Sequence, residues 1–434
     1  MQSVEKNGIV KADYTDERKN AMQTVSQKDR EILRGIARRK LELANSPENE
    51  IIRKKWQALA ALRRETPTVR LLFSNFTNEV ITPRMQCEGG EARALEFRLL
   101  WSLVGRELFD DDTPLSPVYE MSWNTWADPF GIKPHLIPAS GPNPKGFHIE
   151  PVIEDLSTQL DQLRGGSFGI DREGTLEKAA QAQEVFGDIL PVRMTQPSLL
   201  GHITNPLVML MGMENYLLAM YDTPDELHEL MDMATKIYEG QYDLLEKEGL
   251  LLPAHDTAFV AQESFAFNSE LPTENVTSTR QVWGFLESQE TTGVSPAMYG
   301  EFVYPYQDRL VRRFGLLSYG CCERVDAIWE NYLSKWENLR KLSVSPFNNE
   351  EQIGEYLRGS KVTYYSKPRA EFVTNPGPMD EEALRAYFKG VCKAASGCLF
   401  EMAQREVGTI FGDVERGRRY VQIAKECIAE HWQP

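Results

Sequence analysis

The sequence lacks the features that mark several large classes of protein. No apolar run approaches the roughly 20 residues that cross a bilayer, and residues 1–6 lack the apolar stretch of a secretory signal. Six cysteines among 434 residues are too few for a disulfide framework. Glycine-rich phosphate loops, serine-hydrolase elbows and paired Cys-x-x-Cys knuckles are also missing. These absences predict a cytoplasmic chain with reduced cysteines and no membrane span.

Positive charge is in short supply as well. The chain carries 48 Lys and Arg residues against 64 Asp and Glu residues, which gives a formal net charge of −16. An acidic chain gains nothing from counterion release on a phosphate backbone, and anionic lipid does not attract it. We therefore expect neither a nucleic-acid partner nor a membrane partner.

The hydrophobic residues that are present alternate between two periodicities. They make up 41% of the chain, enough for a large core. From residue 68 onward, short apolar or β-branched runs alternate with helical patterns. The runs predict strands at residues 69–74, 148–153, 189–195, 250–255, 316–321, 341–345, 362–366 and 401–407. The patterns predict helices at residues 174–186, 223–248, 296–313, 325–338, 349–357, 379–396 and 413–429. Eight strands alternating with helices predict an α/β fold of the (β/α)8 TIM-barrel type, with a doubly wound open sheet as the alternative.

The N-terminal part of the chain has a different hydrophobic pattern. Residues 27–64 predict two helices that are broken near Ser46, which precedes a proline and is a suitable N-cap. We expect an N-terminal helical extension over residues 1–65 and a barrel over residues 66–434. Thr223 and Ser295 also precede prolines and are predicted to cap later helices.

Reactive groups of a barrel lie at the C-terminal ends of its strands and in the loops that follow. That rule selects His255, Cys321, Cys322, Glu323, Ser345, Lys367 and Glu406. Because side chains alternate along a strand, we expect at most one of Cys321 and Cys322 to face the barrel mouth and the other to pack toward the helices. A thiolate, an imidazole and a carboxylate suit an open zinc site. The alternative is that both cysteines are small buried hydrophobes.

The other polar candidates each have two interpretations. His255 is a candidate ligand or general base, or a hydrogen-bonded loop residue. Glu287 and Glu290 would share one face of a helix, or belong to a solvated surface. Lys367 is a candidate anion-binding group or a solvated lysine. His202 is expected to be an ordinary helical residue, and residues 110–112 an exposed acidic turn.

Several motifs resemble a bacterial branch of the uroporphyrinogen decarboxylase superfamily. They lie at residues 101–112, 220–228, 283–296, 319–323, 338–346 and 366–368. The similarity runs in order over roughly residues 30–430, and the family fold is a TIM barrel. Its members include the heme-pathway decarboxylase and methyltransferases that use a corrinoid, some acting on coenzyme M and others on methoxylated aromatics.

The resemblance implies a methyltransferase rather than a decarboxylase. The arginine-rich Met-Arg-Gln-Ala-Gly-Arg segment of the decarboxylase is missing. The coenzyme M enzymes carry a His-x-Cys zinc pair, and here residues 319–321 keep the cysteine at Cys321 and replace the histidine. The implied reaction moves a methyl group from a small methylated substrate, such as a methoxylated aromatic, to a corrinoid protein. Zinc is the implied cofactor of this chain, and the corrinoid is supplied by the partner protein.

The resemblance and the strand-end rule together assign expected roles. The expected zinc ligands are Cys321, His255 and Glu323, the expected acid, base or catalytic groups are His255, Glu290, Glu323 and Lys367, and the expected pocket residues are Trp283, Tyr319 and Phe347. Two other functions stay open. One is a decarboxylase or lyase that holds carboxylates with Lys367 and Arg369, and the other is a non-catalytic corrinoid- or tetrapyrrole-binding protein. A homodimer is a further expectation.

Overall fold

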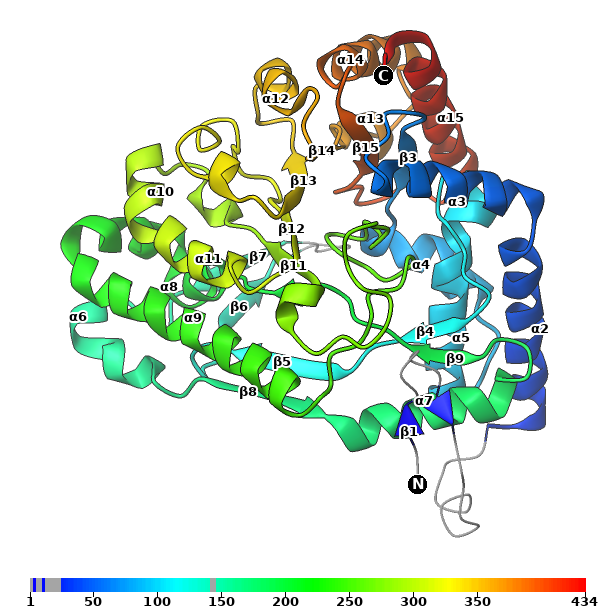
Figure 1. The fold of residues 1–434 in the computed structure, drawn as a ribbon, viewed down its shortest axis with the longest axis horizontal. Coiled ribbons are helices and arrows are strands. Elements are labelled where there is room, and N and C mark those ends of the chain that lie inside the picture. Colours follow the sequence, from blue (N-terminus) through cyan, green and yellow to red (C-terminus); the bar gives the residue numbers. More distant parts are fainter. Residues whose placement is uncertain (1–2, 5–9, 12–24, 141–145) are drawn as a thin grey trace.

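The centre of the molecule is a parallel sheet. The structure, a computed structural model, describes residues 3–4, 10–11, 25–140 and 146–434. Seven strands pair in the order β10-β11-β12-β13-β14-β15-β3 (Figure 1). They are β3 (Thr68–Leu71), β10 (Leu199–Leu200), β11 (Trp283–Leu286), β12 (Leu316–Tyr319), β13 (Leu339–Val344), β14 (Thr363–Ser366) and β15 (Leu399–Gln404). The predicted α/β fold is confirmed at this level, and closure of the sheet into a barrel stays a prediction.

All these pairings are parallel, so the carboxyl ends of the strands meet at one edge. Leu286 pairs with Tyr319, and Val344 pairs with Ser366. Strands β14 and β15 are buried along their whole length, as expected when helices cover a parallel sheet. The helices that follow β13, β14 and β15 lie outside the sheet in Figure 1. The edge formed by the carboxyl ends is therefore the place where polar loop residues converge.

The helices agree with most of the predicted ranges. They are α7 (Arg172–Phe186), α8 (Thr204–Asp222), α9 (Pro224–Lys247), α10 (Pro296–Phe302), α11 (Tyr304–Val311), α12 (Glu350–Leu357), α13 (Glu371–Thr374), α14 (Glu381–Ala394) and α15 (Val414–His431). The predicted helix at 296–313 is split at Val303, because a proline follows at the start of α11.

The predicted helix at residues 325–338 is wrong. Only a short 3-10 helix, η7 (Leu333–Lys335), forms there. Leu333 of η7 is buried in the core, and so are Val325 and Trp336, which lie in irregular backbone. The backbone N–H of Asp326 donates to the side chain of Asn348 at 3.1 Å. Tertiary packing therefore overrides the helical spacing of the apolar residues.

Two further strands, β4 (Tyr119–Met121) and β9 (Val192–Met194), pair in parallel. A long segment of the chain connects them. Within it, β5 (Asn124–Asp128) pairs antiparallel with β8 (Ser167–Asp171), and β6 (His135–Pro138) pairs antiparallel with β7 (Phe147–Glu150). The strand predicted at 148–153 is thus part of a separate two-stranded sheet.

The strand predicted at 250–255 does not form. Pro253 has no N–H to give to a ladder, although its carbonyl accepts from the N–H of Gln196 at 3.2 Å. Strand β11, by contrast, was not expected. Its four residues are all buried, and a short continuous apolar run cannot be told from a buried helix by periodicity.

The two N-terminal helices are confirmed as α2 (Gln27–Ala44) and α3 (Pro47–Ala60). The Ser46 hydroxyl caps α3 by accepting from the N–H of Asn49 at 3.2 Å. Leu33 and Ala37 of α2 pack in one cluster with Leu99 of α5 (Gly90–Val104). The expected division of domains at residue 65 stays a prediction. No described helix has both the length and the apolar character that a membrane span needs.

The acidic run before β4 is a structural anchor rather than an exposed turn. The Asp112 carboxylate accepts from the N–H of Val69 at 2.8 Å, and its other oxygen lies 2.9 Å from Lys55 Nζ. Asp111 accepts from the N–H of Leu71 at 3.3 Å. Both carboxylates are buried, because they satisfy backbone donors of β3 that face them. The predicted exposed turn holds only for Asp110.

Candidate functional site

Charged side chains and two thiols gather where the strands end. Glu287 follows β11, residues 320–323 follow β12, Lys367 follows β14, and Arg405 follows β15. This is the edge at which enzymes with parallel strands place their reactive groups. Five of the seven positions selected from the sequence belong to one electrostatically linked group here: Cys321, Cys322, Glu323, Lys367 and Glu406.

The two cysteines do not point in opposite directions, as the predicted alternation required. Strand β12 ends at Tyr319, and Gly320 then adopts a φ of 97°, which favours glycine. A Cβ at Gly320 would also lie 3.1 Å from the Cβ of Ser343. The turn brings the Sγ atoms of Cys321 and Cys322 to 3.7 Å from each other. The strand rule fails because the strand has already ended.

The loop that carries the cysteines is held by the neighbouring strand. The Ser343 hydroxyl donates to the carbonyl of Cys321 at 2.8 Å, and the Ser345 hydroxyl donates to that of Cys322 at 3.0 Å. The Asn348 amide donates to the carbonyl of Glu323 at 3.2 Å. Ser345, which the strand-end rule selected, thus positions the thiol loop from β13.

Cys321 is the thiol that its surroundings ionise. The Cys322 thiol donates a hydrogen bond to it, and this lowers the pKa of Cys321 to about 6, although burial opposes the change. The positive charges of Lys367 and Arg405 act in the same direction. Arg405 Nη1 lies 3.5 Å from Cys321 Sγ. The same hydrogen bond, together with burial, raises the pKa of Cys322. At neutral pH the pair therefore holds one thiolate, at Cys321.

Lys367 is a buried ammonium beside that thiolate. Its Nζ makes no hydrogen bond with any residue in the described part of the chain, and it lies 5.0 Å from the ring centroid of Tyr365. Burial lowers the pKa of Lys367 to about 8, while the negative charge of Cys321 opposes this. A lysine that titrates near neutrality can both bind an anion and give up a proton.

Glu323 holds the cysteine loop through hydrogen bonds with backbone N–H groups. Its carboxyl oxygens accept from the N–H of Ser288 at 2.8 Å and from the N–H of Cys321 at 2.6 Å. Burial, followed by the negative charges of Glu287 and Cys321, raises the pKa of Glu323 to about 8. Both oxygens are thus engaged with backbone donors, and Glu323 orients Cys321 rather than pointing into open space.

A cleft of about 410 Å³ opens next to these groups. Its lining includes Cys322, Phe347, Lys367, Arg369 and Arg405. Phe347 is 65% exposed and stands at the solvent side. The structure therefore brings together two residues predicted from the sequence, Lys367 and Phe347, in a cleft with an apolar side and several cations.

The two glutamates that were expected on one helix face are not on a common helix and have different partners. Glu287 follows β11 directly, and its Oε1 lies 3.3 Å from His202 Nδ1. Burial would raise the pKa of Glu287, but the hydrogen bond and charge of His202 lower it below its usual value. Glu290 lies in a 3-10 helix, η6 (Gln289–Thr291), and accepts from Thr204 and Asn205 at the start of α8, each at 2.8 Å. Glu290 thus ties α8 to the sheet.

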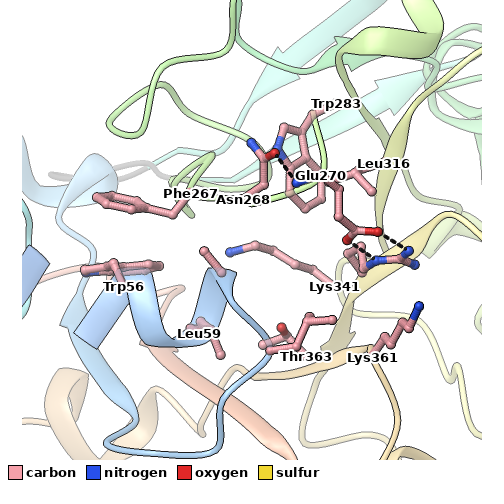
Figure 2. Close-up of a pocket in the computed structure, with 13 residues that line it drawn as sticks. Trp56, Leu59, Phe267, Asn268, Glu270, Trp283, Leu316, Lys341, Lys361 and Thr363 are labelled. Atoms are coloured by element: carbon pink, nitrogen blue, oxygen red, sulfur yellow. Dashed lines mark hydrogen bonds and ion pairs between the residues drawn. The ribbon is translucent and has the colours of Figure 1, made fainter. Parts of the chain in front are cut away.

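The two other expected pocket residues lie elsewhere. Trp283 begins β11, at the opposite end from Glu287, and donates to the carbonyl of Ala266 at 3.3 Å. It lines a small hollow with Trp56, Phe267 and Lys341 (Figure 2). Tyr319 is fully buried and shares hydrogen bonds with Ser288 at 2.9 Å, Tyr299 at 3.1 Å and Gln307 at 3.2 Å. Neither residue lines the cleft beside Lys367.

The expected zinc ligands do not form one group. No three His, Cys, Asp or Glu side chains among the described residues are placed to hold a metal ion. His255 follows the non-strand segment near Pro253, where its N–H donates to the Thr195 hydroxyl at 3.3 Å. Glu323 is engaged with backbone N–H groups. The arrangement of Cys321, Glu323 and His255 therefore does not fit zinc, and the zinc site stays a prediction from the resemblance.

Two residues of the site were not selected from the sequence. Arg405 was passed over because the last strand was predicted to run to residue 407, whereas β15 ends at Gln404 and makes Arg405 the first residue beyond it. His202 was assigned to a helix, but it precedes α8 and follows β10. The strand-end rule would have found both residues had the strand limits been known.

Comparison with known proteins adds little to this geometry. The sequence matches no protein-family model and no curated protein. A solved methyltransferase from Methanosarcina mazei is similar in structure, with 11% sequence identity and a TM-score of 0.47. The alignment covers 86% of this chain and 98% of that one. Likeness at this level supports no conclusion about the activity of this chain.

Proposed function

We propose that this chain is a methyltransferase whose reaction centre is the cleft beside Cys321 and Lys367. The observation that carries the proposal is the buried ammonium of Lys367, held without a hydrogen bond to the described residues next to the thiolate of Cys321. Perturbed groups of opposite charge in a cleft are typical of a reaction centre. The resemblance of residues 319–323 to corrinoid-linked enzymes supplies the reaction class.

The residues of the cleft would handle the leaving group. Transfer breaks the bond between the methyl carbon and a heteroatom of the substrate, and the bonding electrons stay on the heteroatom. Lys367 Nζ would donate a proton to that atom, which makes it a better leaving group. The Cys321 thiolate would keep Lys367 protonated before the reaction, because its charge raises the pKa of the lysine. Solvent would then return the proton to Lys367.

The methyl acceptor is proposed to be a corrinoid carried by a partner protein. A bound corrinoid supplies a nucleophilic cobalt that takes the methyl group. The cleft is reachable from outside, since Phe347 is 65% exposed beside Lys367. Arg405 and Arg369 would hold the acidic part of the substrate, while Phe347 would contact its apolar body. A methoxylated aromatic acid has both parts.

A decarboxylase is the second candidate, and one observation favours it. Three cations, Lys367, Arg369 and Arg405, line the same cleft with two carboxylates, Glu371 and Glu406. The lining therefore has one positive charge in excess, which can hold a carboxylate. A decarboxylase would release carbon dioxide and leave every methyl group in place. The two reactions therefore have different products in the same assay mixture.

The test is methyl transfer to free cob(I)alamin. The purified chain is mixed with 4-methoxybenzoate, methanol or methylamine, and methylcobalamin is followed by its absorbance. We expect methylcobalamin from at least one donor, and a loss of at least about 100-fold in Lys367→Met, in line with the loss of a general acid. Lys361→Met is the matched control, because Lys361 is an exposed lysine near the other end of β14. No methylcobalamin from any donor, or equal rates for both variants, would refute the proposal.

A further inference from the structure

A second cavity lies away from the cysteine cleft. It encloses about 430 Å³, and none of the residues that line it lines the cleft. One wall is a face of α5 that carries Phe97, Arg98, Trp101 and Ser102, positions that follow the helical repeat, and Gly105 directly after the helix extends it. The facing wall includes Tyr119, Met121 and Ser122 at the end of β4. A volume of this size suits a small organic ligand.

Aromatic rings make up much of its surface. Phe73 and Trp101 lie with ring centroids 4.8 Å apart, and Phe97 lies 5.8 Å from Trp101. Across the cavity, Phe259 and Phe265 are stacked at 5.5 Å. Phe259 is 41% exposed although it is large and apolar. Two sets of rings that face a common space favour a ligand with a flat apolar body.

Two cations of the cavity, Lys40 and Arg98, are not engaged in an ion pair within the described part of the chain. Lys40 Nζ is buried and donates to the carbonyl of Val118 at 2.9 Å, which leaves two of its three donors for another group. Burial lowers the pKa of Lys40 to about 8, although the negative charge of Glu120, which is paired with Arg193, opposes this.

The remaining charges of the cavity are already balanced. Glu120 pairs with Arg193 at 2.6 Å and accepts from Thr257 at 2.7 Å. Arg70 donates to Thr113 at 3.2 Å and lies over the ring of Phe265, with the negative charge of Asp111 nearby. The excess charge of the cavity is therefore positive and is located at Lys40 and Arg98.

We infer that this cavity binds a small organic anion with a flat apolar body. The acidic group of the ligand binds Lys40 and Arg98. Its apolar body lies between two sets of rings: Phe73, Phe97 and Trp101 form one set, and Phe259 and Phe265 form the other. The inference does not depend on the reaction proposed for the Cys321 cleft, because the two sites share no lining residue. It assigns a ligand site to the face where α2 and α5 meet β4.

The test uses 1-naphthoate as the probe and 1-naphthamide as its uncharged counterpart, with calorimetric titration of the full chain. We expect naphthoate to bind at least about tenfold more tightly than the amide, the factor that one charge-assisted contact supplies. Arg98→Gln should weaken naphthoate binding about tenfold and leave amide binding unchanged. Phe259→Ala should weaken both. Arg98 and Phe259 are exposed, so neither change threatens the fold.

Arg369→Gln is the matched control, because it removes a cation from the cysteine cleft instead. We expect this variant to bind naphthoate as the parent does. If Arg369→Gln weakens binding and Arg98→Gln does not, the probe occupies the cysteine cleft and the inference fails. It also fails if naphthoate and the amide bind equally, or if neither binds.

Discussion

The Sγ atoms of Cys321 and Cys322 lie 3.7 Å apart, although the two residues are adjacent in sequence. The positive φ of Gly320 makes this approach possible, because it turns the chain just after β12. One thiol can then donate to the other and stabilise its ionised form, while Arg405 and Lys367 add positive charge. The pair therefore works as one unit with a single negative charge.

The first prediction concerns the titration of this unit. The thiolate absorbance of the protein, followed in the ultraviolet against pH, should show a component with a midpoint near pH 6. Cys321→Ser should remove that component. Cys322→Ala should keep it but move its midpoint upward, because the donor that lowers the pKa of Cys321 is lost. A midpoint near the ordinary value of about 8.5 in the parent would contradict the assignment.

Substitution of Arg405 is a second and independent test of the negative charge on Cys321. Arg405→Met should raise the midpoint of Cys321, since its Nη1 lies 3.5 Å from the sulfur. Arg405→Lys keeps a positive charge on a flexible side chain and should raise the midpoint less. Equal midpoints in the parent and Arg405→Met would show that this guanidinium does not act on Cys321.

Removing the buried ammonium should make the protein more stable while abolishing its activity. Lys367→Met should raise the melting temperature at pH 7 by about 1–3 °C, because a buried charge without a hydrogen bond to the described residues is costly. Burial lowers the pKa of Lys367 to about 8, so this cost is present in full below pH 8. This cost of burying the charge disappears as the pH rises from 8 toward 10.5, the ordinary pKa of a lysine in the unfolded chain. Melting curves between pH 6 and pH 10 check the trend. A lower melting temperature for the variant at pH 7 would contradict it.

A different lysine should behave in the opposite way. Lys341, labelled in Figure 2, is buried at the other end of the sheet. Its Nζ lies 2.7 Å from Glu401. Lys341→Met should destabilise the fold by about 3–5 kcal/mol, because Glu401 would be left buried and unpaired. Adding Glu401→Leu should recover most of the loss. Denaturant unfolding of both variants makes the comparison, and equal stability of the single and double variants would argue against the pair.

Two helix starts with similar sequences should differ in their response to mutation. The Ser295 hydroxyl accepts from the N–H of Met298 at 3.3 Å, whereas Thr223 makes no such bond to α9. Ser295→Ala should therefore lower the free energy of unfolding by about 1 kcal/mol, and Thr223→Ala should change it by less than about 0.5 kcal/mol. Denaturant unfolding measures both changes, and equal losses would mean that both hydroxyls act as caps.

The sequence by itself determined the parts of this protein that depend on local spacing. Helices α7, α9, α12, α14 and α15 lie where amphipathic periodicity predicted them, and α3 begins after Ser46 as its capping residue indicated. Strands β12, β13, β14 and β15 were found in the same way. These features need only neighbouring residues, so the α/β class and the region of the thiol loop followed from the sequence.

The tertiary structure decided where strands end and which side chains meet. Strand limits depend on partners far along the chain, so β11 was missed and Arg405 was taken for a strand residue. The pairing of Cys321 with Cys322, the engagement of Glu323 by backbone N–H groups and the different partners of Glu287 and Glu290 all depend on turns and contacts between distant elements. Periodicity carries no information about such contacts, because they arise only when the strands align their carboxyl ends at one edge.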